Sequence, residues 1–465
     1  MKIFLLFTEI NQKFGPLYYQ HGLASISALL KKNDIQSISL IHFTKKPDLL
    51  KWEEYLKHQN PVIIGIYSTT EQFHFVKELV AKVPKGIFTV CGGPHPTCHP
   101  TCIEDIPRLD AICIGEGEYP MLELVDTLKK GKDYSKIRNL WVRKDGNIIR
   151  NETRPFIANL DELPFEDREL FNLQNSIDRY GFSQVRIITT RGCPYQCTYC
   201  ANKHISKAQP GRYVRFRSAA HIMDELNFLN KKYKFKEIFF DDDIFMMDKT
   251  IRTEFCRRYP EEIGKPFVFS GHVEICNEEM LKELKKAGGR RVDFGVESGN
   301  ENLRRKILRR NMTNRQILEA TKMAKRVGLQ VKTLNMVGLP EETIEKYLDT
   351  VSLNQEIKPD VVSIFVFYPY PGTELYAYCI KKGYFNPDEP LPKGYISRRI
   401  SLLSLPDFSR SDIARCFQRF GFRVFRKFSI LKAIGYALIY SKYGEFLIKI
   451  TAKLRNIIAK ILTGF

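Results

Sequence analysis

Three cysteines lie at a spacing that predicts an iron–sulfur site. Residues 193–200 read CPYQCTYC, so that Cys193, Cys197 and Cys200 are spaced C-x3-C-x2-C directly after an apolar run. Three thiolates on one tight loop can hold three irons of a 4Fe–4S cube, which normally takes four cysteines. The next cysteine is Cys256. One iron would therefore stay open to bind a substrate or a cofactor, like the open position of a catalytic zinc site.

The same three cysteines together with His204 could instead form a structural zinc site. The first gap of three residues differs from the usual zinc pairs, and an aromatic residue, Tyr199, precedes the last cysteine. This pattern resembles the cluster motif of the radical S-adenosylmethionine (SAM) enzymes. The resemblance implies that the open iron chelates the amino and carboxylate groups of SAM and that Tyr199 lies near its adenine. We favour the cluster over zinc.

Six apolar, strand-like runs separated by helical segments predict parallel βα units over residues 185–385. The runs are 185–190, 237–241, 266–270, 291–296, 330–337 and 361–368. Six units are fewer than the eight of a closed barrel, which favours a partial (β/α)6 barrel. The resemblance to radical SAM enzymes implies the same core, with its chemistry at the carboxyl ends of the strands.

Acidic and glycine-containing segments follow several of these strands, for example DDD at 241–243 and FGVESG at 294–299. A helix N-terminus could account for one of the three aspartates. The resemblance implies SAM contacts at Tyr199, Asp242, Asp243, Glu297, Ser298 and Gly338. His272 follows the third strand, where many relatives carry an arginine for the SAM carboxylate, so this position departs from the family. Tyr368 and Tyr370 either line the substrate space or pack a turn. No catalytic residue is assigned beyond the cluster ligands.

Residues 1–130 alternate apolar strands with helices and predict a doubly wound, Rossmann-like α/β sheet. The strands are expected at 2–7, 37–43, 62–67, 87–91 and 111–114. Small residues follow three of these strands, where such folds bind ligands. Taken alone, ordinary turn chemistry explains them. Together they resemble the cobalamin-binding domain found ahead of many radical SAM cores. That resemblance implies cobalamin contacts at Ser68, Thr69, Gly92, Gly93, His95, Pro96, Gly115, Glu116 and Gly117.

The first domain lacks the motif Asp-x-His-x-x-Gly, whose histidine ligates cobalt in cobalamin domains of the mutase and methionine-synthase kind. His21 is followed by Gly22 and does not fit that pattern. We therefore expect base-off cobalamin without a protein histidine on cobalt. The alternative is a degenerate domain that has lost the cofactor.

A connector at 131–184, with a hairpin at 137–150, precedes the core, and a helical region at 386–465 follows it. From residue 401 onward the chain has twelve Lys or Arg against three Asp or Glu. Apolar residues repeat on one side of a final helix at 446–461. Such a basic amphipathic helix can lie on an anionic membrane surface. Alternatively, the tail helices pack on the barrel and expose their basic side. No recognition motif supports nucleic-acid binding.

The composition, with 43% hydrophobic and 27% charged residues and a net charge of +20, is typical of a globular protein. Eleven scattered cysteines do not indicate a disulfide framework. The first apolar segment is too short for a signal peptide, and no run of about 18 apolar residues predicts a spanning helix. We expect a cytoplasmic protein, peripheral at the inner membrane face if the tail binds lipid.

Together the resemblances imply a cobalamin-dependent radical SAM enzyme. It would cleave SAM to a 5′-deoxyadenosyl radical and methylate an unactivated carbon of a small-molecule or lipid substrate. An electron donor such as flavodoxin or ferredoxin would reduce the cluster. One alternative is a radical enzyme without methyl transfer, like the anaerobic oxidative cyclase of a magnesium porphyrin ester or a thioether- or ring-forming enzyme. Another is a non-catalytic iron–sulfur or cobalamin-binding sensor.

Overall fold

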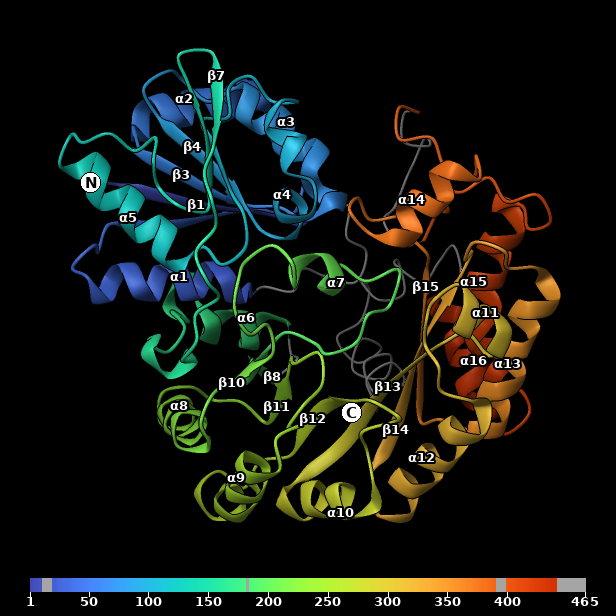
Figure 1. Ribbon diagram of the computed structural model, residues 1–465. Helices are drawn as coiled ribbons and strands as arrows, with labels where there is room; N and C mark the ends of the chain where they lie inside the picture. Colours follow the sequence, from blue (N-terminus) through green and yellow to red (C-terminus); the bar gives the residue numbers. More distant parts are fainter. Residues whose placement is uncertain (11–18, 181–183, 390–398, 441–465) are drawn as a thin grey trace.

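The computed structural model describes residues 1–10, 19–180, 184–389 and 399–440. Figure 1 shows an N-terminal sheet domain in blue and cyan. A second sheet with its helices follows in green to orange, and the C-terminal helices lie beside β15 in red. The mixed α/β architecture confirms the predicted fold class.

The first sheet contains seven strands in the order β2-β1-β3-β4-β5-β6-β7. The first five are parallel, with β1 between β2 and β3, as in a doubly wound sheet. Every residue of β1 is buried, because helices cover both faces of the sheet. The strands are β1 (Ile3–Thr8), β2 (Ile38–Phe43), β3 (Ile63–Tyr67), β4 (Phe88–Gly92), β5 (Ala111–Cys113), β6 (Leu140–Lys144) and β7 (Asn147–Arg150).

Two apolar clusters hold helices on opposite faces of this sheet. Leu23, Leu30, Leu124 and Val125 pack α1 and α5 on one face. Trp52, Leu56, Val76 and Leu79 pack α2 and α3 on the other. The helices of this domain are α1 (His21–Lys32), α2 (Leu49–Gln59), α3 (Phe73–Ala81), α4 (Pro94–Cys98) and α5 (Glu118–Lys129). The carboxyl ends of the parallel strands are left for the turns that precede α4 and α5.

The hairpin predicted for the connector belongs to the first sheet. Its strand β6 pairs antiparallel with β5 through Ile112 opposite Trp141 and Cys113 opposite Leu140. The hairpin strand β7 then ends the sheet. The chain reaches the second sheet through α6 (Leu173–Tyr180).

The second sheet has six parallel strands in the order β15-β14-β13-β12-β11-β8, which confirms the predicted partial barrel. A short antiparallel pair, β9 with β10, follows β8. The strands are β8 (Gln184–Ile187), β9 (Thr190–Arg191), β10 (Arg215–Phe216), β11 (Glu237–Phe240), β12 (Phe267–Gly271), β13 (Gly289–Glu297), β14 (Gln330–Val337) and β15 (Val361–Val366). The helices are α7 (Asn202–Ile205), α8 (Ala219–Lys232), α9 (Lys249–Glu262), α10 (Glu278–Ala287), α11 (Glu301–Lys306), α12 (Asn314–Arg326), α13 (Ile344–Ile357) and α14 (Glu374–Lys381).

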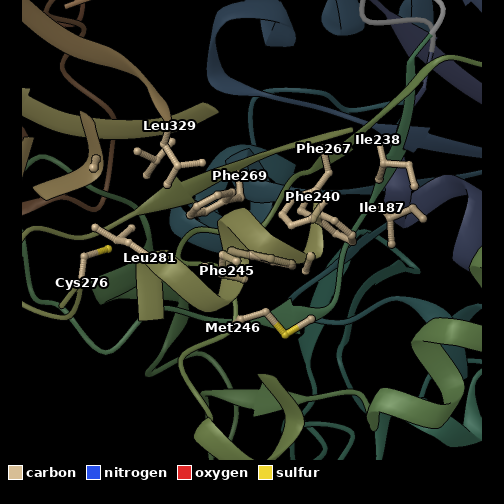
Figure 2. Packing of buried hydrophobic residues seen from close by; sticks show 14 of the residues in the cluster. Ile187, Ile238, Phe240, Phe245, Met246, Phe267, Phe269, Cys276, Leu281 and Leu329 are labelled. Atoms are coloured by element: carbon tan, nitrogen blue, oxygen red, sulfur yellow. The ribbon is translucent and has the colours of Figure 1, made fainter. Parts of the chain in front are cut away.

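An aromatic cluster fixes the central strands of this sheet (Figure 2). Phe240 stacks on Phe245 with ring centroids 4.2 Å apart, and Phe267 meets Phe240 edge-on. All three side chains are completely buried. Burying rings of this size stabilises the fold by about 1.5–3 kcal/mol each. The cluster therefore anchors β11 and the turn after it, which carries the acidic residues of the site.

The C-terminal helices α15 (Arg410–Phe425) and α16 (Ile430–Ile439) pack on the outer side of the half-barrel. The Tyr347 hydroxyl donates to the carbonyl of Cys416, and the Tyr436 hydroxyl accepts from the Val362 amide. These residues pack on the barrel, as one interpretation of the tail expects. The predicted amphipathic helix at 446–461 lies outside the described residues. None of the helices in the described ranges has the length and apolar character needed to cross a lipid bilayer.

Candidate active site

A loop that begins directly after β9 carries the three motif cysteines. Gly192 starts the loop with a φ of +92°, and a Cβ there would lie 2.5 Å from the carbonyl oxygen of Tyr213. Only glycine fits that backbone. Thr198 holds the loop in place because its amide and its hydroxyl both donate hydrogen bonds. Its amide donates to the carbonyl of Leu308 at 3.2 Å, and its hydroxyl donates to the carbonyl of Ile307 at 2.5 Å.

The motif cysteines are thiols whose protons a bound metal would displace. Burial raises the pKa of Cys193 to about 11 and that of Cys200 to about 12, and a bound iron would displace these protons. In the described part of the chain, no three His, Cys, Asp or Glu side chains converge on one metal position. Ligands of a cube bind different irons, so they need not converge. His204 Nδ1 donates to the carbonyl of Gly372 at 3.1 Å.

A buried polar group lies next to the cluster loop. Glu297 ends β13 with a φ of +62°, a conformation that favours glycine and stores strain at functional sites. Burial raises the pKa of Glu297, whereas Arg310 and a hydrogen bond with Tyr199 oppose that shift. Arg310 was not predicted, because the pair Arg309-Arg310 after a short helix has no distinguishing pattern. His272 packs against Tyr195 with ring centroids 3.7 Å apart, as an ordinary packed histidine would.

A cavity of about 370 Å³ opens beside Cys200 at the barrel end. Tyr199 and Glu297 line it on the cluster side, and Tyr368 and Tyr370 line it opposite. The other lining residues include Leu334, Met336, Phe365, Val366 and Phe367 from β14, β15 and the turn after β15. We call this space the barrel cavity. Two of the predicted SAM residues, Tyr199 and Glu297, therefore share this cavity with Cys200, and their SAM contacts stay predictions.

Three other predicted SAM residues are engaged in local structure. The Asp242 carboxylate accepts from the amides of Thr189 and Thr190, and burial raises its pKa to about 7. Ser298 is completely buried, and its hydroxyl accepts from the amide of Asn300. A Cβ on Gly338 would lie 3.1 Å from Ile413 of α15. These residues shape the strand ends, and their SAM contacts stay predictions.

A second cavity, of about 530 Å³, lies between the two sheets. We call it the interdomain cavity. Gly92, Gly93, Gly115 and Gly117 line it at the strand ends of the first sheet, and Asp243 lines it from the second. Bare backbone on this wall lets a flat ligand approach closely and presents amide groups to it. The volume of the interdomain cavity and its glycine-rich wall are typical of a cofactor site. Asp243 also accepts from the Asn202 amide group at 3.0 Å.

Four of the other predicted cobalamin residues lie outside this lining. His95 is buried against Phe73, its Nδ1 lies 3.1 Å from the Thr70 hydroxyl, and burial lowers its pKa to about 3. Thr69 lines the barrel cavity. Ser68 and Pro96 are buried. None of these four is among the lining of the interdomain cavity, so their contacts with cobalamin stay predictions.

Glu116 lines the interdomain cavity but is held by two arginines of the second domain. Its carboxylate lies 2.8 Å from Arg191 and 3.0 Å from Arg215. Burial alone would raise the pKa of Glu116, but the two guanidinium groups hold it below its usual value. Arg191 also pairs with Glu118 at 2.6 Å. Because Arg191 lies two positions before Cys193, these ion pairs connect the first sheet to the cluster loop.

His21 lies on the same wall and bridges two carboxylates. Its Nδ1 is 2.9 Å from Glu166 and its Nε2 is 3.3 Å from Asp241. Burial alone would lower its pKa, but Glu166 and Asp241 raise it. This arrangement joins α1 to the connector and to the end of β11. The base-off form of cobalamin stays a prediction.

Comparison with known proteins matches two regions of the chain. The radical SAM superfamily matches residues 187–353, and the B12 binding domain matches residues 10–125. An uncharacterized methyltransferase of Pyrococcus horikoshii is 31% identical over 394 residues, which are 82% of this chain and 83% of that protein. The cytidylyl-2-hydroxyethylphosphonate methyltransferase of Streptomyces wedmorensis is 24% identical over 377 residues, 72% of this chain and 70% of that protein.

A solved structure shares the fold over the whole chain. The cobalamin-dependent SAM radical enzyme OxsB, with aqua-cobalamin and SAM bound, has a TM-score of 0.70 at 15% identity. The match covers 100% of this chain and 75% of that one. The two family matches cover strands β2 to β5 of the first sheet and β11 to β14 of the half-barrel.

Proposed function

Because this chain belongs to the radical SAM superfamily and carries a B12-binding domain, we propose that it is a cobalamin-dependent radical SAM methyltransferase. The methyltransferase names of its relatives support methyl transfer. One structural observation carries the proposal: the two cavities meet at the cluster loop. Cys200 and Ala201 line the barrel cavity, Asn202 lines the interdomain cavity, and Pro94 lines both.

Each cavity offers residues suited to one cofactor. Cys193, Cys197 and Cys200 would hold the cluster, and Tyr199 with Glu297 would hold SAM. Gly92, Gly93, Gly115 and Gly117 would admit cobalamin to the other cavity. When bound, the cluster with SAM supplies a 5′-deoxyadenosyl radical that removes a hydrogen atom from carbon, and cobalamin supplies the methyl group. The chain itself binds, orients and excludes water. The family requires an external reductant, and we propose a flavodoxin or ferredoxin.

The test is anaerobic production with cobalamin supplied, reconstitution of the cluster, and analysis of iron, cobalt and SAM cleavage under reductant. We expect about four irons and one cobalamin per chain, with 5′-deoxyadenosine as a product. A variant with alanine at positions 193, 197 and 200 is the control and should form none. Zinc in the wild-type protein without SAM cleavage would contradict the proposal.

The same preparation separates the alternatives. Methyl transfer from SAM also yields S-adenosylhomocysteine, whereas a cyclase or rearrangement enzyme yields 5′-deoxyadenosine alone. A cluster without cobalamin would keep the radical chemistry and remove methyl transfer. Bound cofactors without any SAM cleavage would indicate a sensor.

We further propose that the C-terminal region contacts an anionic membrane surface, which favours a lipid among the small-molecule substrates. The supporting observation is the exposed apolar face of α16. Leu431 is 80% exposed, Ile430 58% and Ile434 48%. Exposed Arg426 and Lys427 precede this face and suit anionic headgroups.

Flotation with vesicles of phosphatidylglycerol or phosphatidylcholine tests this contact. We expect the wild-type protein to float with the anionic vesicles and a Leu431→Glu/Ile434→Glu variant to float less. The control is Leu50→Glu, which alters an exposed leucine on α2 of the first domain. Equal flotation of all three proteins would rule out the α16 face.

A further inference from the structure

Arg310 is half-buried and places its guanidinium group against the cluster loop. Its Nη1 lies 3.6 Å from the Cys197 sulfur and 3.5 Å from the Tyr199 hydroxyl. Its Nη2 donates to the carbonyl of Gly295 at 2.8 Å. Its Nε is buried and has no hydrogen-bond partner among the described residues. No function assigned so far uses this side chain.

The backbone around Arg310 is built to hold it there. Arg309 has a φ of +52°, and this turn brings the chain back toward the end of β13. The residues just before it, Ile307 and Leu308, accept the two hydrogen bonds from Thr198 of the cluster loop. A Cβ on Gly295 would lie 3.4 Å from Nη2, so glycine leaves room for the guanidinium on the strand. Two hydrogen bonds therefore join this turn to the cluster loop.

The charge of Arg310 lacks a close carboxylate partner. Among the described residues, none of the ion pairs within 4.0 Å includes it. An arginine guanidinium stays protonated in proteins, and Glu297 is the carboxylate that acts on it. A buried cation is costly unless an anion compensates it. The Cys197 sulfur lies 3.6 Å from Nη1, so a thiolate or a bound cluster there would add negative charge beside that of Glu297.

We infer that Arg310 is a positioning residue that donates an N–H···S hydrogen bond to the Cys197 thiolate and raises the reduction potential of the cluster. The inference rests on the proposed function. Reduction adds one electron and one negative charge to the cluster. A fixed positive charge and a hydrogen bond to a ligand sulfur stabilise the reduced form more than the oxidised form. Arg310 would thus make the cluster easier to reduce by its electron donor.

The test is a potentiometric titration of the reconstituted cluster, followed by electron paramagnetic resonance, without SAM. We expect Arg310→Met to lower the equilibrium constant for reduction about tenfold, which is about 59 mV for one electron. Arg310→Lys keeps the charge and should recover part of this loss. The matched control is Arg309→Met, because Arg309 pairs with Glu374 at 2.5 Å and its side chain is 56% exposed. This control should keep the wild-type potential.

Iron content and SAM affinity are measured on the same samples. An Arg310→Met protein with full iron and the wild-type potential would overturn the inference. So would a loss of SAM affinity at an unchanged potential, which would assign Arg310 to the SAM carboxylate. If the methionine variant assembles no cluster, Arg310→Lys and Arg310→Gln decide by the same criterion. A wild-type protein without any cluster would overturn the proposed function as well, so the two failures are distinguishable.

Discussion

The three motif cysteines lie together on the loop after β9, whereas the other cysteines are dispersed over the fold. Replacing Cys193, Cys197 or Cys200 by alanine removes one ligand of a cube that already has an open iron. We expect each variant to lose most of its iron after reconstitution. Cys256, which is partly buried on α9, is the control, because Cys256→Ala leaves the loop intact. Iron retained in all three loop variants would contradict the assignment.

Asp242 makes stability depend on pH. Its folded-state pKa is about 7, whereas an unfolded aspartate titrates near about 3.9. The folded state therefore binds the proton more tightly, and stability falls as pH rises from about 4 to 7. In Asp242→Asn the amide oxygen still accepts from the Thr189 and Thr190 amides, and the charge is gone. We therefore expect the stability of this variant not to decrease over this pH range. In the wild type the decrease is of the order of a few kcal/mol.

Urea unfolding at pH 5 and pH 8 measures this difference. Asp145→Asn, at the exposed tip of the β6–β7 hairpin, is the control and should behave like the wild type. If Asp242→Asn kept the full wild-type dependence on pH, the carboxylate would not be the titrating group. Unchanged SAM affinity in the same variant would support a role in positioning the strand end.

The sequence predicted residues by their motif and could not predict which way they point. Cys193 and Glu297 lie where expected, because a loop and a strand end present them directly. Ser298, in the same motif, is buried, and its hydroxyl accepts a hydrogen bond from the Asn300 amide. Arg310 could not be found, because its role depends on a turn that brings it back to Cys197.

The cluster loop depends on a single backbone conformation at its start. Gly192→Ala would place a Cβ 2.5 Å from the Tyr213 carbonyl, on backbone that cannot move aside. We expect this variant to assemble less cluster and to lose more than about 1 kcal/mol of stability. Gly86 has the same φ of +92° with nothing within 4 Å, so Gly86→Ala carries the strain without the clash. Equal losses in both variants would show that the clash is unimportant; iron analysis and thermal unfolding measure them.

Strands were the most predictable elements, because long apolar runs bounded by polar turns specify them. All five strands predicted for the first sheet and all six predicted for the half-barrel are present. The β6–β7 hairpin was located correctly in the sequence but assigned to the connector. In the sequence, α5 separates β6 from its partner strand β5. Local sequence patterns do not predict a pairing between strands that are separated in this way.

The two domains are joined by a small set of buried charges. Arg191 pairs with both Glu116 and Glu118, and its replacement would leave Glu118 with only the Ser25 hydroxyl. Breaking a buried pair costs about 3–5 kcal/mol. We therefore expect Arg191→Met to destabilise the protein by about that amount and to expose the connector to proteases.

An exposed ion pair supplies the control for the domain contact. Arg150 and Glu104 pair with side chains 57% and 51% exposed, and Arg150→Met should cost less than about 1 kcal/mol. Denaturant unfolding and limited proteolysis compare the two variants. If Arg191→Met behaved like Arg150→Met, the buried pairs would not hold the domains together. The sequence predicted both domains but not this contact, because it forms between residues that are far apart in the chain.

One contact at the wall of the barrel cavity can form only late in protein synthesis. The Tyr370 hydroxyl donates to Glu71 at 2.5 Å across a separation of 299 positions. At about 5–20 residues per second, a ribosome needs about 15–60 s to make the second partner after the first. The cysteine loop emerges earlier, when this contact does not yet exist. Iron delivered during synthesis would therefore meet the cysteine loop before the contact between Tyr370 and Glu71 has formed.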